Sequence, residues 1–184
     1  MAVDPRDRIW NVAYFLWYDT KYNAELASRM VDRLKAIDDV TKVLVALTAS
    51  GSAVAGWNLW AKGGFDVGWA ILAGSGALLS IIHGSLGIPA RLKDWLEMKR
   101  DFLGLRVEID NFRSSMGNHP DFDVVKYEEM LAGFRAKFGE CEGRIPSDFF
   151  ATSRLKSKCQ DSINAEIAGR SSGPQQEQQD GNRN

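Results

Sequence analysis

The sequence predicts an all-α membrane protein with a long N-terminal helix, a two-helix transmembrane hairpin and a cytoplasmic helical bundle with heptad seams. Three observations predict this class. The only ionisable side chains between Lys42 and Arg91 are Lys62, Asp66 and His83. No Pro or Gly interrupts the chain from Arg6 to Asp39. After Arg91, apolar residues recur at alternating steps of three and four, which is the spacing of a heptad seam.

The composition alone hides this organisation. The chain has 184 residues, of which 45% are hydrophobic and 26% charged, and its formal net charge is -1. These averages are typical of a soluble domain, because charged helices and an uncharged region cancel in the mean. The near-zero net charge argues against nonspecific coating of nucleic acid.

The first helix is expected over residues 4–42. Asp4 is suited to cap its N-terminus, and Pro5 is suited to the first helical position. The first half of this helix is rich in aromatic residues: Trp10, Tyr14, Phe15, Trp17, Tyr18 and Tyr22. Two interpretations stay open, namely packing against other helices and contact with the inner membrane interface, where Trp and Tyr are favoured.

The transmembrane hairpin is expected over residues 43–89, with spans at 43–61 and 67–88. A helix as long as the first span measures about 28 Å, close to the roughly 30 Å thickness of the hydrocarbon core. Gly63 and Gly64 supply the tight turn between the spans. Basic residues flank the outer ends of both spans, so the positive-inside rule places both termini in the cytoplasm. The alternative is a soluble protein with a buried Ala/Gly-rich helical hairpin.

The cytoplasmic helical region is expected over residues 90–168, followed by a disordered tail over 169–184 that lacks apolar residues. Two seams are expected, separated by the helix-ending sequence Gly117-Asn118-His119-Pro120. They suggest a helical hairpin, an intersubunit bundle, or both. The residues proposed for oligomerisation are Trp95, Met98, Phe102, Leu105, Ile109, Phe112 and Met116 in the first seam, and Tyr127, Leu131, Phe134 and Phe138 in the second. A last short helix is expected to carry Leu155, Cys159, Ile163 and Ile167.

Candidate functional residues lie within and just after the spans. The pore-lining candidates are Gly76, Ser80, His83, Gly87, Thr48 and Ser52. Small residues also favour close helix packing, and His83 can snorkel to the interface, so both alternatives remain. Gly84, Gly87 and Pro89 interrupt the helical pattern and predict either a hinge or a passive kink.

A basic group begins within the second seam and continues after it, and it forms a candidate site for an anionic ligand: Arg135, Lys137, Arg144, Arg154, Lys156 and Lys158. Interleaved acidic residues leave an ordinary solvated surface as the alternative. The 2 His and 2 Cys residues are too scattered for a metal site of conventional spacing. No nucleophile–base pair or phosphate-binding loop is evident, so the sequence predicts neither an enzyme nor a cofactor.

The segment YFLWYDTKYNAELASRMVDRLK, followed by the tight two-span hairpin and further helices, resembles the SLATT family. These are two-transmembrane effectors of bacterial nucleotide-signalling conflict systems. The resemblance covers residues 6 to 165 and rests on layout. It implies a homo-oligomeric, pore-forming effector of antiphage defence in the bacterial inner membrane. A nucleotide or oligonucleotide made by a partner nucleotidyltransferase would control it. The alternative function is a membrane-anchored helical scaffold that has no conducting pore.

Overall fold

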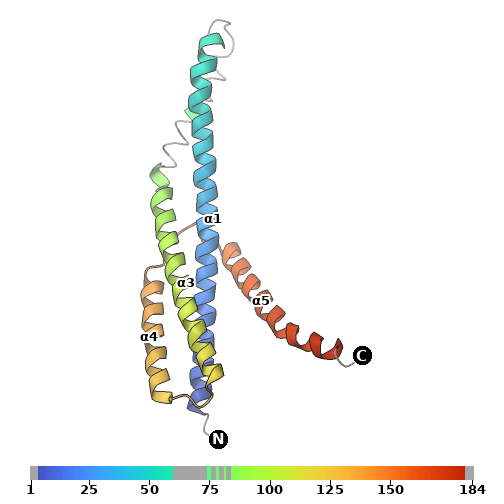
Figure 1. Cartoon of the computed structure of the whole chain (residues 1–184). Helices are drawn as coiled ribbons and strands as arrows, with labels where there is room; N and C mark the ends of the chain where they lie inside the picture. Colours follow the sequence, from blue (N-terminus) through green and yellow to red (C-terminus); the bar gives the residue numbers. More distant parts are fainter. Residues whose placement is uncertain (1–3, 60–73, 76–77, 79–80, 82–83, 181–184) are drawn as a thin grey trace. The chain divides into compact units, whose positions relative to one another are not determined.

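The computed structural model describes residues 4–59, 74–75, 78, 81 and 84–180. Its helices are α1 (Pro5–Leu59), α3 (Ile88–Asn118), α4 (Val124–Gly143) and α5 (Ser153–Asp180), and the described residues contain no strand (Figure 1). The predicted all-α class is therefore confirmed. The chain divides into two compact units. Unit 1 comprises Met1–Arg29 with Trp95–Asn184, and unit 2 comprises Met30–Asp94.

Helix α1 begins where the sequence predicts. The Asp4 Oδ1 atom accepts a hydrogen bond of 2.8 Å from the Arg6 amide, and the Asp4 carbonyl accepts one of 3.2 Å from the Arg8 amide. Pro5 takes the first helical position, where its missing N–H costs nothing. The helix then continues to Leu59, so residue 42 is not a helix end.

The core of unit 1 forms where α3 packs against α1 and α4. Its fully or nearly buried members are Ile9, Ala13, Leu16, Trp17, Leu105, Ile109, Phe112, Met116, Phe122 and Leu131. The steps of three and four along α1 and α3 place these residues on one face of each helix. Burial of these faces is the main stabilising contribution that the structure offers for unit 1.

The residues of the first seam are buried by this packing within one chain. All seven α3 residues proposed for oligomerisation are 0–6% exposed. On α4, Leu131 is buried, while Tyr127, Phe134 and Phe138 are partly buried against the core. The ring centroids of Phe112 and Phe134 lie 5.3 Å apart, and those of Phe102 and Phe138 lie 5.9 Å apart. The described structure therefore uses the α3 residues for packing within one chain, and contacts of the partly buried α4 residues with a second copy stay a prediction.

Helices α4 and α5 confirm the predicted order of elements, but the tail differs. Asp123 caps α4, accepting bonds from the amides of Val125 and Lys126 at 3.0 and 3.5 Å. On α5, Cys159 and Ile163 are buried, as the apolar spacing predicts. However, α5 continues to Asp180, into the tail that was expected to be disordered. The absence of apolar residues argues against packing but not against helix, and Gln and Glu have high helix propensity.

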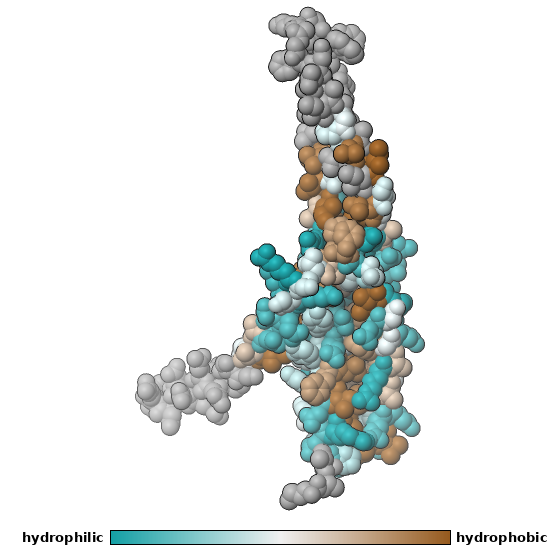
Figure 2. Space-filling model, turned by 180° about the vertical axis from the view of Figure 1, so that it is seen from behind, coloured by the Kyte–Doolittle hydropathy of each residue, from teal (hydrophilic) through white to brown (hydrophobic). Residues whose placement is uncertain are grey.

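Unit 2 contains the second part of α1 and the start of α3. The first expected span lies in α1 as far as Leu59, whereas most of the second span lies outside the described residues. Among the residues that the structure describes, no helix is both long enough and apolar enough to cross a membrane. Large apolar side chains are nevertheless exposed in this unit, and Figure 2 shows brown atoms gathered beside the grey residues. They are Val40, Val43, Leu44, Leu78 and Ile81, each 40–65% exposed.

Candidate functional site

The described residues offer two candidate sites, one in each unit. The first is the helix junction at Gly84–Arg91 in unit 2. The second is a cleft between α1 and α4 in unit 1. Each is described by itself.

The chain makes a turn at Gly87, whose φ of +59° lies in the left-handed region. Glycine adopts this conformation without the Cβ clash that other L-residues meet. The Gly87 amide donates to the Gly84 carbonyl at 3.2 Å, and the Gly87 carbonyl accepts from the Arg91 amide at 3.1 Å. Arg91 Nε also donates to the Leu86 carbonyl at 2.9 Å, and Ile88 is fully buried. The predicted interruption is thus a defined turn, after which Ile88 and Pro89 begin α3.

Most pore-lining candidates cannot be placed. Gly76, Ser80 and His83 lie outside the described residues. Thr48 and Ser52 lie in α1, but their side chains also fall outside the description. Gly87 is the one candidate described in full, and its role in the structure is the turn just given.

The cleft in unit 1 has a volume of about 240 Å³. Its apolar lining comes from Ile9 and Val12 of α1 and from Leu131 and Ala132 of α4, and its charged lining is Arg8, Glu128 and Arg135. On α4 these positions follow the spacing i, i+3, i+4, i+7, which is one helix face. A neighbouring hollow of about 470 Å³ shares Arg8 and Val12 and adds Pro5, Asn11 and Phe15.

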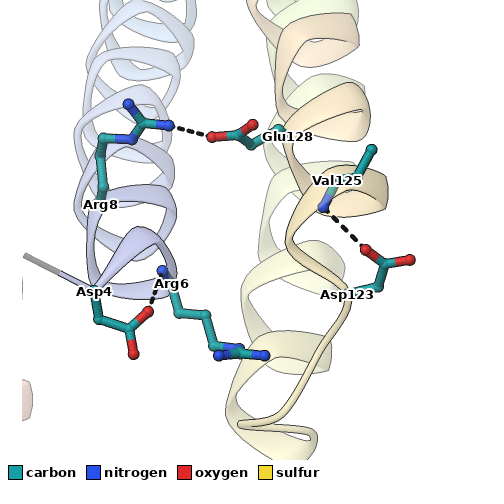
Figure 3. A network of polar contacts seen from close by, with 6 residues as sticks. All are labelled: Asp4, Arg6, Arg8, Asp123, Val125 and Glu128. Carbon is teal, nitrogen blue, oxygen red and sulfur yellow. Dashed lines mark hydrogen bonds and ion pairs between the residues drawn. The ribbon is translucent and has the colours of Figure 1, made fainter.

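A polar network lies at the N-terminal end of the cleft (Figure 3). Arg8 of α1 and Glu128 of α4 point toward each other and form an ion pair. Arg6 Nε donates to the Phe122 carbonyl at 3.2 Å, and the Arg6 guanidinium lies 5.8 Å from the Phe122 ring centroid. These contacts join the first turn of α1 to the loop before α4, and they position Arg8 at the cleft.

The structure divides the basic residues that the sequence grouped together. Lys137 pairs with Glu108 at 2.6 Å, and Arg144 pairs with Asp101 at 3.1 Å. Arg154, Lys156 and Lys158 are exposed on α5. Arg135 alone lines the cleft, beside Arg8. Sequence reasoning missed Arg8, because its proximity to α4 depends on how the two helices pack.

The aromatic residues of α1 hold an arginine. The guanidinium of Arg113 lies 5.7, 5.2 and 4.8 Å from the ring centroids of Trp10, Tyr14 and Trp17. Cation–π attraction therefore ties α1 to α3 along this face. Packing between helices accounts for Tyr14 and Trp17, whereas Phe15 is 65% exposed and lies at the edge of the second hollow.

Helix α5 is held on α1 by polar contacts as well as by Cys159 and Ile163. Lys21 Nζ pairs with Glu166 Oε1 at 2.6 Å, and the Lys21 side chain is only 8% exposed. Tyr18 donates to Asn164 Oδ1 at 2.8 Å and accepts a hydrogen bond from Gln160. Burial raises the pKa of the Cys159 thiol, which disfavours the reactive thiolate.

Comparisons with protein-family models, with curated proteins and with solved structures find no match. Within the described residues, no group of three or more His, Cys, Asp or Glu side chains is arranged to hold a metal ion. The described sites therefore offer arginine side chains at a cleft and a left-handed glycine turn before α3.

Proposed function

We propose that this chain is an oligomeric effector of the bacterial inner membrane that forms a pore in antiphage defence. Both termini lie in the cytoplasm, and a nucleotide or oligonucleotide from a partner nucleotidyltransferase controls opening. The SLATT-like layout supports this function, as do the two long segments without formal charge.

One observation carries the membrane part of the proposal. Large apolar side chains are exposed on unit 2 next to the first uncharged segment, where Val40 and Val43 are each 58% exposed. Contiguous exposed apolar surface in a folded protein calls for a covering phase or partner. The charged residues that would keep such a region in water are absent from Val43 to Ala61. Lipid is the covering phase that suits segments of this length.

The proposal is tested by expressing the full chain in bacteria, with and without phage infection, while recording membrane potential with a voltage-sensitive dye. Depolarisation is expected in at least one condition. Gly76→Leu should suppress the depolarisation, because the bulky side chain would obstruct the pore that Gly76, Ser80 and His83 are proposed to line on one face of the second span. Gly74→Leu is the matched control, since about 200° of helical rotation separates the two positions. Depolarisation in none of the conditions, or equal depolarisation by both variants, would count against a pore along this face.

A membrane-anchored helical scaffold is the second candidate, and the burial of the α3 seam favours it. Phe102 and Ile109 are fully buried within one chain, so their side chains are not available at the surface for a second copy. If the hairpin is only an anchor, its replacement by an unrelated two-span hairpin leaves phage protection intact. If the hairpin conducts, the same exchange abolishes protection while the protein still reaches the membrane.

A further inference from the structure

We propose that the cleft between α1 and α4 binds a small amphiphilic anion, of the class of an organic phosphate with an apolar body. Arg8 and Arg135 would hold the anionic head, and Val12 and Phe15 would receive the apolar body. This inference rests on the cleft in unit 1 alone and is independent of any pore.

The charge balance of the cleft favours an anion. Its lining contains two guanidinium groups and one carboxylate, that of Glu128. Glu128 pairs with Arg8, whereas Arg135 makes no ion pair or side-chain hydrogen bond within the described part of the chain. Guanidinium groups present planar sets of donors that match phosphate oxygens, and such bonds are among the strongest in proteins. The cleft therefore has an arginine whose donors are open to a ligand.

The Arg8–Glu128 pair can yield to such a ligand. The two side chains are 66% and 43% exposed, so water screens their attraction. Exposed ion pairs contribute little to stability, and opening this one costs correspondingly little. A phosphate that displaces Glu128 meets both arginines, and Glu128 acts as an internal competitor that restricts binding to anions of higher charge.

The surroundings of the arginines call for an apolar body on the ligand. Ile9, Val12, Leu131 and Ala132 line the cleft itself, and the adjoining hollow adds Pro5 and Phe15. Phe15 contacts the Tyr14 ring in a T-shaped arrangement and is still 65% exposed, which leaves much of its apolar surface available to a ligand. Ligand sites commonly combine apolar walls with a few charged groups that fix orientation, as this cleft does.

The test is isothermal titration of the full chain in phosphatidylcholine nanodiscs, with empty discs as the blank. The probes are phenyl phosphate, inorganic phosphate and phenol, which separate the head from the body. Phenyl phosphate is expected to bind more tightly than either part alone. Arg135→Gln and Arg8→Gln should each weaken it about tenfold or more, and Glu128→Gln should tighten it. Arg154→Gln is the matched control on α5, outside the cleft, and should leave the affinity unchanged.

Three results would overturn the proposal. Equal weakening by Arg154→Gln would mean that any basic surface attracts the probe. Equal binding of phenol and phenyl phosphate, unaffected by either arginine variant, would leave only an apolar hollow. Weaker binding of phenyl phosphate in phosphatidylglycerol discs, measured at a salt concentration that screens the surface charge of the disc, would give the cleft to lipid head groups instead of a soluble ligand. Circular dichroism of each variant checks the fold, and loss of binding in a variant with unaltered helicity counts as site-specific.

Discussion

The ion pair between Lys21 and Glu166 yields the sharpest test of how α5 is held. Lys21 Nζ lies 2.6 Å from Glu166 Oε1 and 5.0 Å from the centroid of the Trp17 ring. Glu166→Gln removes the negative charge but keeps the size of the side chain. The Lys21 ammonium then stays buried with a weaker partner, so α5 is expected to detach more often.

The exposure of the two partners sets the magnitude. Removing one partner of a fully buried pair costs about 3–5 kcal/mol. The Glu166 side chain is 44% exposed, so water compensates part of the loss. We therefore expect about 1–2 kcal/mol for Glu166→Gln, in line with the loss of one charged hydrogen bond. Lys21→Met combined with Glu166→Gln should recover most of this loss, because no buried charge is then left without its partner.

Cys159 supplies the assay, because it lies on α5 and is 0% exposed. In a Cys141→Ser background, the rate of maleimide labelling at Cys159 measures how often α5 opens. A cost of 1–2 kcal/mol raises this rate about 5–30-fold. Asp161→Asn makes the same acid-to-amide change at an exposed α5 position and should leave the rate unchanged. An unchanged rate in Glu166→Gln, or an equal rise in Asp161→Asn, would refute the role assigned to the ion pair.

Three further predictions concern single positions. Gly87→Ala should destabilise the junction by about 1–2 kcal/mol, because alanine resists the left-handed φ, whereas Gly84→Ala should be neutral or stabilising. Hydrogen exchange over residues 84–91 measures both variants, and equal protection in the two would contradict the left-handed turn assigned to Gly87. Asp123→Ala should lower the free energy of unfolding by about 0.5–2 kcal/mol through loss of the α4 cap, as measured by chemical denaturation with Asp121→Ala as the control. Equal effects of the two substitutions would contradict a stabilising role of the Asp123 cap. Because burial raises the pKa of Cys159 from 9.0, the folded state favours the protonated thiol, so stability is full below pH 9.0 and falls as the pH rises further. Denaturation midpoints of the parent chain should therefore fall more steeply above that pH than those of Cys159→Ala, and parallel curves would contradict this.

Local pattern predicted most of the helical framework. The Asp4-Pro5 start, the stop near Asn118 and the spacing from Trp95 to Met116 depend only on neighbouring residues, and the structure confirms all three. Helix α5 extends to Asp180, into the tail for which the sequence predicts disorder, although Gly173 and Pro174 lie in this stretch and disfavour helix. The seam was predicted correctly, but the sequence left its partner open between a helical hairpin and an intersubunit bundle, because a heptad pattern does not distinguish a helix of the same chain from one of another subunit.

Contacts between parts of the chain that lie far apart in sequence could not be predicted from the local pattern of residues. Arg8 and Arg135 meet at one cleft, and Lys21 meets Glu166, only through the register in which the helices pack. That register depends on side-chain volumes along both helices, which a one-dimensional pattern does not contain. The basic residues grouped in the sequence were accordingly divided among separate ion pairs and helix faces in the structure.

The turn at Gly87 makes the two chain segments that flank the uncharged region mechanically unequal. Within unit 2, helix α1 continues from Met30 to Leu59 without a break, so a twist applied to this part is carried along an unbroken ladder of hydrogen bonds. The segment that leads into α3 instead passes through the left-handed Gly87, where the continuous helical conformation is interrupted. The two segments should therefore transmit torsion differently, since one is continuous helix and the other contains a break in the helix at Gly87.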